Sequence, residues 1–395
     1  MKKPGKLAVT VLSAISCIVC VLSCKENRSS QGAGRPEGLV VYIGTYGENL
    51  YRYIFDPSDR SFTPLGQAAL KNPSYLALGE ENSKDGIYDL YAVSENGASS
   101  SVASFADDIK LSSTGECRNV GADPCFILFD NSLSILLTAD YSGGSLSVFR
   151  VNADGSVGGR IQCLDFSGSG PVRGRQESSH IHQLKFLPVP SYSGEGKGTE
   201  LSRWLLASDL GADRIRVMSL SGDTLVCHPE LDILCGEGSG PRHMEIDTLR
   251  KSIYCLTELS GELLVFGYRA GEDGTPDIYQ EARMVADEAG GAASADIHLH
   301  PSGRFIYTSH RDRNDGISVF SVSDDGKVTR SGYCRTGKHP RNFAVTPDGA
   351  YMLVACRNDR SVEVYSIDAV TGKLSFSGDR LRFKEDMPSC VVIAQ

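Results

Sequence analysis

Residues 41–46 of the chain read VYIGTY, an apolar run that ends on a polar residue, and this pattern returns six more times. The copies are LYAVSE (90–95), LLTADY (136–141), LLASDL (205–210), IYCLTE (253–258), IYTSHR (306–311) and MLVACR (352–357). Most copies begin about 46 to 53 residues after the one before, which suits one four-stranded blade of a β-propeller. The repeat therefore predicts a propeller with seven blades.

A second apolar strand precedes each later copy, and we interpret it as the inner strand of a blade. The copies are PSYLAL (73–78), PCFILF (124–129), HQLKFL (182–187), PRHMEI (241–246), ADIHLH (295–300), PRNFAV (340–345) and PSCVVI (388–393). An alternating strand such as SVEVYSID (361–368) and a shorter outer strand such as KLSFSG (373–378) complete each antiparallel unit. The one long interval, before Leu205, is explained by two insertions rich in turn formers, 166–179 and 188–203.

The two ends of the chain do not match, and the mismatch predicts how the ring closes. The first copy, at 41–46, has no inner strand before it, whereas the inner strand at 388–393 has nothing after it. Seven complete blades result only if the C-terminal strand pairs with the N-terminal blade, which leaves no large open edge. The alternative fold, an array of β-sandwiches, does not predict this pairing. We expect an all-β, seven-bladed β-propeller over residues 39–395.

The N-terminus has the pattern of an export signal. Three lysines precede an apolar run from Leu7 to Leu22, and Ser23-Cys24 follows it. A small residue before a cysteine at this place resembles a bacterial lipoprotein signal, so we expect residues 1–23 to be removed and Cys24 to be acylated. The alternative is an ordinary cleaved signal. Residues 24–38 then form a flexible tether, and the protein is expected in the cell envelope as a monomer, held to the membrane only by its lipid.

Charge and cysteine content exclude several classes of function. The net charge of −9 argues against nucleic acid as a partner, because binding phosphate backbones needs clustered basic residues. Twelve cysteines fall to nine once Cys17, Cys20 and Cys24 are set aside, and no C-x-x-C pair remains to build a metal or haem site. We expect free core thiols, no metal and no cofactor. Two His-x-His pairs, at 180/182 and 298/300, are the metal-binding alternative, but they lack a matching carboxylate cluster.

Candidate functional residues gather on one face of the predicted ring. The inner strand of a blade begins at the face where the next strand ends, so starts and ends meet there. The starts supply His182, Arg242 and Arg341, and the ends supply Tyr141, Asp209, Glu258, Arg311 and Arg357. The insertion 166–179 adds Arg173 and Arg175 at the rim. We expect these side chains to project into a solvated mouth, although Arg341 and Arg357 could instead buttress the ring.

Several short motifs on this face resemble one known family. They are SHIHQ (179–183), DLGADR (209–214), GPRHM (240–244), Glu258-Leu259 and ADIH (295–298) with Arg311. Together they are similar to the propeller-type 6-phosphogluconolactonases and the related fungal muconate-lactonizing propellers, over about residues 39–395. The resemblance implies hydrolysis of a sugar lactone and catalytic positions at His182, Arg242, Glu258 and Arg311. No Gly-x-Ser-x-Gly motif is present to support a serine acyl-enzyme.

Opening a lactone requires a base for water, a partner for the oxyanion and a grip on an anionic substrate. Asp209, Arg173, Arg175, Arg341 and Arg357 are the predicted substrate-binding residues. Neighbouring arginines depress the pKa of a carboxylate, so we favour His182 as base and Glu258 as its orienter, with the reverse left open. A non-catalytic surface propeller that binds sugar or protein, and a muconate-cycloisomerase-like lyase, are the alternatives. Export weakens the case for a phosphorylated substrate.

Overall fold

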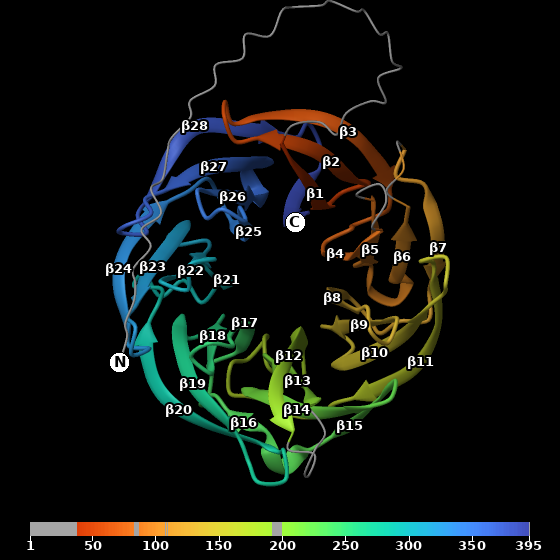
Figure 1. The fold of residues 1–395 in the computed structure, drawn as a ribbon, viewed down its shortest axis with the longest axis vertical. Coiled ribbons are helices and arrows are strands. Elements are labelled where there is room, and N and C mark those ends of the chain that lie inside the picture. The colour runs from red at the N-terminus through yellow and green to blue at the C-terminus, as the bar shows by residue number, and fades with distance from the viewer. Residues whose placement is uncertain (1–37, 83–86, 107, 109, 192–199, 395) are drawn as a thin grey trace, which may run out of the picture. The chain divides into compact units, whose positions relative to one another are not determined.

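The computed structural model describes residues 38–82, 87–106, 108, 110–191 and 200–394. The chain divides into two units, Met1–Pro36 and Glu37–Gln395. The expected signal, the acylated Cys24 and all but the last residue of the tether lie outside the described residues, and they stay predictions. In the second unit, seven β-sheets stand in a ring around a common axis (Figure 1). The all-β, seven-bladed propeller is therefore confirmed.

Each sheet runs from an inner strand beside the axis to an outer strand at the rim. The first three are β29(Met387–Ile393)-β1(Leu39–Tyr46)-β2(Asn49–Asp56)-β3(Ser61–Ala69), β4(Leu76–Asn82)-β5(Ile87–Ser94)-β6(Ser101–Phe105)-β7(Ser113–Cys117) and β8(Pro124–Asp130)-β9(Ile135–Asp140)-β10(Ser145–Val151)-β11(Val157–Asp165). The fourth is β12(Ile181–Ser191)-β13(Glu200–Asp209)-β14(Arg214–Ser221)-β15(Thr224–Cys227), with β16(Ile233–Leu234) also on β14.

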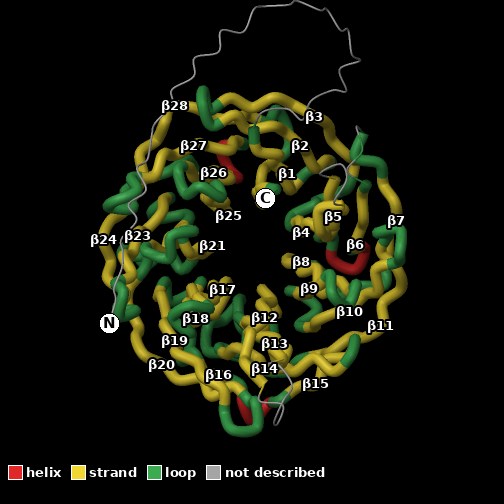
Figure 2. Tube along the Cα trace, in the orientation of Figure 1, coloured by secondary structure: helices red, strands yellow, loops and turns green. Residues whose placement is uncertain are grey.

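The last three sheets are regular. They are β17(Pro241–Asp247)-β18(Ser252–Thr257)-β19(Glu262–Ala270)-β20(Pro276–Val285), β21(Ser294–Leu299)-β22(Phe305–His310)-β23(Gly316–Val322)-β24(Val328–Arg335) and β25(Pro340–Val345)-β26(Tyr351–Cys356)-β27(Ser361–Ile367)-β28(Leu374–Arg382). Among the described residues, helix is limited to three single turns, η1(Gly97–Ser99), η2(Pro229–Leu231) and η3(Arg357–Asp359) (Figure 2).

The C-terminal strand closes the ring as the sequence predicts. β29 pairs antiparallel with β1, with Ile393 opposite Val41 and Val391 opposite Ile43. The first blade is thus built from both ends of the domain, and β29, its inner strand, is the closing element of the ring. An edge that would otherwise be open is paired.

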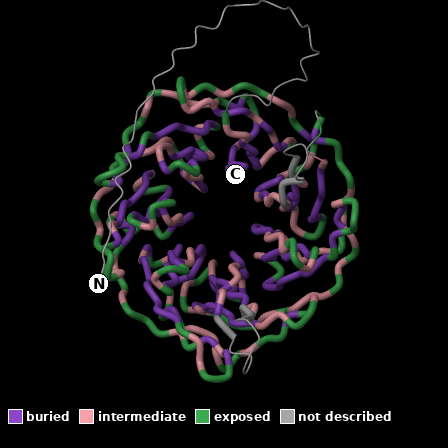
Figure 3. Tube along the Cα trace, in the orientation of Figure 1, coloured by how far each residue is buried: buried purple, intermediate pink, exposed green. Residues whose placement is uncertain are grey.

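Burial is highest in the second strands of the blades and lowest at the rim, while the inner strands are partly buried at one end. Every residue of β9, β18 and β22 is buried, because these second strands lie between neighbouring blades on both faces (Figure 3). The outer strands alternate between exposed and partly buried positions, as in β24. β28 covers 9 residues, two more than the 7 of β27, and is longer than the sequence suggested, whereas the outer strands β7 and β15 are short, with 5 and 4 residues.

The insertion at 188–203 contains more strand than its turn formers indicate. β12 and β13 extend their pairing through Pro188 opposite Arg203 and Ser191 opposite Glu200. Proline has no N–H to donate, yet it is tolerated here because an inner strand pairs along one side only. The insertion therefore lengthens a hairpin of the fourth blade instead of forming a free loop at these positions.

Candidate active site

Four inner strands carry a β-bulge at their second residue. The pairing register of β8, β12, β17 and β25 shifts there, and the residues that the shift leaves over are Cys125, His182, Arg242 and Arg341. A bulge bends the strand and re-aims its extra side chain, and bulges are frequent beside active sites. The face at which inner strands begin therefore receives four chemically useful side chains from four blades.

The second strands of the blades end on the same face. Glu258 follows β18, Arg311 follows β22 and Arg357 follows β26, as the positions of these residues at the ends of their repeats predict. Tyr141 follows β9 in the same way. The order of blades around the ring thus brings together residues that are far apart in sequence.

Nine side chains from these positions and from one loop enclose a cavity of about 210 Å³. They are Tyr46, Glu95, Cys125, Tyr141, Arg175, His182, Glu258, Arg311 and Arg341. Three larger cavities, of about 460, 400 and 270 Å³, lie between the loop at 169–171 and β14, between β16 and β20, and between β24 and the turn at 371–374. None of them is lined by a predicted site residue, so the smaller cavity is the candidate active site.

Glu258 is the centre of charge in this site. Arg175 Nη2 lies 2.5 Å from its Oε1, while Arg242 Nε and Arg311 Nη2 lie 2.7 and 3.2 Å from its Oε2. Burial raises the pKa of Glu258, but Arg311, Arg242 and Arg175 outweigh burial and lower this pKa to about 2. Glu258 is therefore ionised at neutral pH and a poor proton acceptor.

Arg242 and Arg311 are buried, which corrects the expectation that they project into a solvated mouth. Their side chains are 2 and 7 % exposed. Arg242 Nη1 donates to the Ala295 carbonyl, and Arg311 Nε donates to the Ala293 carbonyl over 2.7 Å. Backbone and Glu258 together fix both guanidinium groups, so the positive charge is in place before any substrate binds.

Truncation of these arginines should therefore cost stability as well as activity. Arg311→Ala strands the carbonyl of Ala293, and a buried group without its partner costs about 1–3 kcal/mol. Because Arg311 also lines the cavity, we expect lactone hydrolysis to fall about 10²–10³-fold. Thermal unfolding and a lactone assay check both effects. Arg173→Ala, at an exposed position, is the control for stability. An unchanged melting temperature in Arg311→Ala would contradict the structural role of the buried Arg311 guanidinium.

His182 supplies an imidazole to the cavity without a carboxylate to orient it. Burial and the positive charge of Arg242 lower the pKa of His182 well below its ordinary value, so the ring is neutral at neutral pH. Its Nδ1 lies 3.7 Å from Cys125 Sγ. Glu258 is held by arginines, and no described contact joins it to His182. The expected role of Glu258 as orienter of His182 is therefore not seen in the structure.

Tyr46 organises the opposite side of the cavity. Arg341 Nη2 donates to its hydroxyl over 2.6 Å, and that hydroxyl donates to Glu95 Oε2 over 2.7 Å. The guanidinium carbons of Arg341 and Arg357 lie 5.0 and 4.7 Å from the centre of the ring. Arg341 lines the cavity, whereas Arg357 is absent from its lining and contacts Tyr46 instead.

Of the two predicted rim arginines, the structure brings only Arg175 into the site. Its loop is fixed by Gln176, whose buried Nε2 donates to the Leu210 carbonyl over 2.8 Å and to Asp213 Oδ1 over 2.7 Å. Arg173 is exposed and does not line the cavity.

Asp209 is a correction to the predicted substrate-binding set. It is the second-to-last residue of its repeat, so its side chain points to the opposite side of the strand from the last residue. The corresponding residues of all seven repeats are buried: Thr45, Ser94, Asp140, Asp209, Thr257, His310 and Cys356. Asp209 accepts hydrogen bonds from Ser179, from the His180 amide and from Arg216, which stabilises the turn beneath the site.

The same register identifies residues that the sequence reasoning missed. Tyr46 and Glu95 are the last residues of the first two repeats, the positions equivalent to Glu258 and Arg311. Cys125 is the second residue of its inner strand, equivalent to Arg242 and Arg341. An alignment of the seven repeats, residue by residue, would have found all three.

The His-x-His pairs do not converge in the structure. His180 stacks on Tyr141 and its Nδ1 bonds the Tyr141 carbonyl, while His298 is ion-paired to Asp296. Among the residues that the structure describes, no group of three histidine, cysteine or acidic side chains is placed to hold a metal ion. Within the same residues, no helix has the length and apolar character needed to cross a bilayer.

Comparison with known proteins shows the family to which the chain is similar. Residues 40–393 match the family model described as Lactonase, 7-bladed beta-propeller. A 6-phosphogluconolactonase of Formosa agariphila is 32% identical over 353 residues, which are 85% of this chain and 94% of that one. A 6-phosphogluconolactonase of Bacillus subtilis is 27% identical over 85% of this chain and 93% of its own.

Solved structures agree with the family model. A Bacteroides fragilis protein, provisionally named a 6-phosphogluconolactonase, superposes with a TM-score of 0.80 at 31% identity, covering 92% of this chain and 100% of its own. A periplasmic gluconolactonase of Pseudomonas aeruginosa gives a TM-score of 0.75 at 26% identity, covering 90% of this chain and 99% of its own. The model match spans nearly the whole described domain, and the chain belongs to the family of seven-bladed β-propeller lactonases.

Proposed function

We propose that this chain hydrolyses a sugar lactone that carries an anionic group. The observation that supports this most is the charge of the cavity, where Arg175, Arg311 and Arg341 face two carboxylates, Glu95 and Glu258, beside the neutral imidazole of His182. Three cations against two anions leave a net positive site, and guanidinium forks bind carboxylate or phosphate strongly. The names of the relatives, 6-phosphogluconolactonase and gluconolactonase, support a lactone as substrate.

The arrangement suits attack by water on the lactone carbonyl. His182 takes a proton from water, and the resulting hydroxide adds to the carbonyl carbon. The buried Arg311 and the partly exposed Arg175, both ion-paired to Glu258, stabilise the oxyanion. The ring C–O bond then breaks, and the departing alkoxide oxygen recovers the proton from His182. The product is the open-chain hydroxy acid.

Glu258 serves in this scheme as the anchor of the arginines. Its charge keeps three guanidinium groups within 3.2 Å of one carboxylate in a buried site, where they would otherwise repel one another. An anionic substrate that enters the cavity shares these cations with Glu258. Glu258 thereby holds the oxyanion partners in position without itself moving a proton.

We further propose that the protein acts outside the cytoplasm as a lipid-anchored monomer. The sequence Ser23-Cys24 at the end of an apolar run supports acylation at Cys24. The periplasmic gluconolactonase of Pseudomonas aeruginosa provides a relative named for that compartment. A substrate outside the cytoplasm need not be the phosphorylated sugar. A sugar lactone that carries a carboxylate would bind to the same arginines of the cavity.

A panel of lactones tests the proposed substrate class. Residues 38–395 are assayed by pH-stat against matched lactones that differ only in an anionic group, with a metal chelator present throughout. We expect kcat/KM to be higher for the anionic member by about 10-fold or more, since a charge-assisted contact contributes about 1.5–3 kcal/mol. Loss of activity on chelation, with recovery on adding a divalent ion, would contradict the metal-independent scheme. Binding of sugars without turnover would favour the surface-propeller alternative.

A further inference from the structure

A second histidine lies directly behind the proposed base. His243 follows Arg242 in β17 and is 2 % exposed. Its Nδ1 lies 2.6 Å from Asp296 Oδ1. Asp296 is itself fixed by the Asn342 amide group over 2.6 Å and by the Phe343 backbone N–H over 3.2 Å. Strands of three consecutive blades, β17, β21 and β25, therefore hold this histidine and its carboxylate in one orientation.

The carboxylate determines which nitrogen of His243 carries the proton. Asp296 is ion-paired to His298, and burial, although it raises the pKa of Asp296, is outweighed by His298 and His243, so this pKa lies well below its ordinary value. An ionised carboxylate only accepts hydrogen bonds, so Nδ1 of His243 must be the donor. The other nitrogen, Nε2, then presents a lone pair.

That lone pair has no partner in the described residues, although Nε2 is fully buried. Three rings surround His243: His182 at 5.2 Å, Phe126 at 6.0 Å and Tyr75 at 6.1 Å between ring centres. An unpaired acceptor in a buried place costs stability and calls for an explanation. His182 is the nearest of the three rings, lines the cavity and carries a ring N–H, the kind of donor that this lone pair requires.

We propose that His243, oriented by Asp296, is a positioning residue that accepts a hydrogen bond from His182 and so directs the other nitrogen of His182 into the cavity as the base. The inference deepens the proposed lactone hydrolysis and rests on it. It explains how His182 is oriented although Glu258 is not bonded to it. In a catalytic triad a carboxylate orients the histidine that acts as base. Here Asp296 orients His243, and His243 in turn orients His182.

The series of hydrogen bonds from Asp296 through His243 to His182 leaves the proton balance of the reaction unchanged. The water proton resides on His182 while hydroxide adds to the carbonyl carbon, and it passes to the alkoxide when the ring C–O bond breaks. His243 stays neutral throughout the reaction. Burial and Arg242 lower the pKa of His243, Asp296 raises it, and the resulting pKa is about 4. His243 assists by accepting a hydrogen bond, which is stronger when its donor is the imidazolium of His182.

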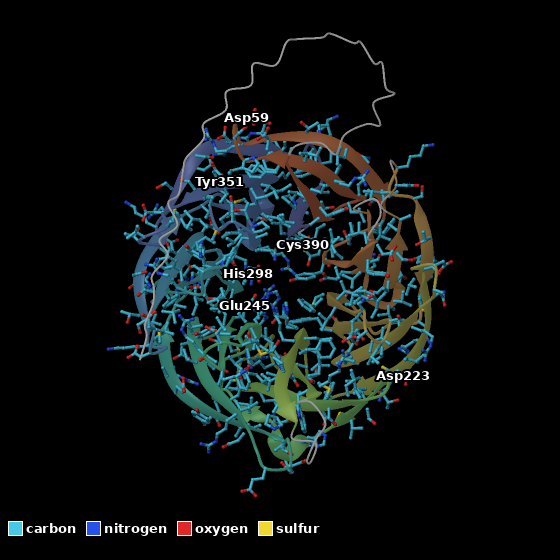
Figure 4. The ribbon with its side chains drawn as sticks, in the orientation of Figure 1. Asp59, Asp223, Glu245, His298, Tyr351 and Cys390 are labelled. Atoms are coloured by element: carbon cyan, nitrogen blue, oxygen red, sulfur yellow. The ribbon has the colours of Figure 1, made fainter. Side chains whose placement is uncertain are left out.

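Charged groups on the far side keep Asp296 in its role. His298 contacts Asp296 over 3.0 Å and Glu245 over 3.1 Å, and Lys185 contacts Glu245 over 3.1 Å. Burial lowers the pKa of His298, but Asp296 and Glu245 outweigh burial and raise it to about 10. Figure 4 shows Glu245 and His298 close together at the inner edge of the ring. Besides these groups, Arg242, Tyr75 and His182 are the titratable side chains that face His243.

Nitrogen NMR of the wild-type protein and steady-state kinetics test the proposal together. The chain has 8 histidines, so the ring signals of His182 and His243 are assigned by replacing each in turn. We expect His243 to carry its proton on Nδ1 and His182 to occupy one tautomer. In His243→Phe, His182 should lose its tautomer preference, and kcat should fall about 10- to 100-fold, a part of the roughly 10²–10⁴-fold that a positioned base contributes.

The KM of His243→Phe should stay unchanged, because the residue touches no substrate. His300→Phe is the matched control, a buried histidine just beyond β21 that bonds Ser302 and the Gly349 carbonyl, and it should alter neither signal nor kcat. A proton on Nε2 of wild-type His243 overturns the proposal, even if the variant fails to fold. An active wild type with an unchanged His243→Phe also overturns it. A wild type without lactonase activity but with the expected tautomers would count against the proposed function alone.

Discussion

Replacing His182 by phenylalanine is expected to lower kcat for lactone hydrolysis about 10²–10⁴-fold, the range that a positioned general base contributes. Phenylalanine keeps the ring that packs against Tyr141 and His243, so the fold should be retained. Steady-state rates measured with the pH-stat, beside circular dichroism of the variant, separate a chemical loss from an unfolded protein.

His180→Phe is the matched control for this prediction. His180 stands two residues earlier and stacks on Tyr141 with ring centres 4.4 Å apart, yet it does not line the cavity. Its replacement should leave kcat within about threefold of wild type, as expected for a residue that makes no contact in the transition state. Equal losses in both variants would mean that the packing of Tyr141, and not the base, is what the His182 substitution disturbs.

The dependence of lactone hydrolysis on pH also tests His182 as the base. His182 acts as a base only when neutral, and its pKa is lowered by burial and by Arg242. Activity is therefore present above this lowered pKa and lost as the pH falls through it, well below the ordinary titration range of histidine. A wild-type profile that instead loses activity on the alkaline side of neutrality would assign the chemistry to a different group.

Deleting residues 388–395 is expected to abolish the folded domain. β29 pairs with β1, and its Val391 and Ile393 are almost fully buried, each contributing about 1.5–3 kcal/mol. The strand also bonds both neighbouring blades, since the Val391 amide donates to Asn342 and Ser389 donates to the Ser74 carbonyl. These losses are of the order of the whole stability of a domain, about 5–15 kcal/mol.

The deletion has a matched control at the other end of the chain. Removing residues 1–37 takes away no described strand, and the melting temperature should not change. A soluble protein without residues 388–395 that melts like the wild type would contradict ring closure by β29.

The fold could be predicted from the sequence because its signal is repeated seven times. Second strands such as β9, β18 and β22 are buried on both faces, so the apolar run and its polar end recur even where the loops differ. The unmatched strands at 41–46 and 388–393 determined the closure, which β29 confirms. The extension of β12 by Pro188 was missed because proline was interpreted as a turn former, whereas a strand with one free edge accommodates it.

The site could be predicted only in part, because position along a strand is easier to infer than the depth of a side chain. Their positions at the ends of second strands predicted that Glu258 and Arg311 lie on one face. Those positions did not indicate that Arg311 is fixed by backbone carbonyls. The bulges that re-aim His182 and Arg341 depend on register between strands, which a single strand does not reveal. A shift of one residue separated Asp209 from the cavity, since successive side chains point to opposite faces.

The time course of lactone ring opening at the arginine-lined cavity tests the central claim most directly. Residues 38–395 and the Arg311→Ala variant are compared at equal concentration on one anionic sugar lactone, against the spontaneous reaction in buffer. The account predicts a wild-type rate far above the spontaneous one and a loss of about 10²–10³-fold in the variant. A wild-type rate equal to the spontaneous one, or a variant as fast as the wild type, would contradict it.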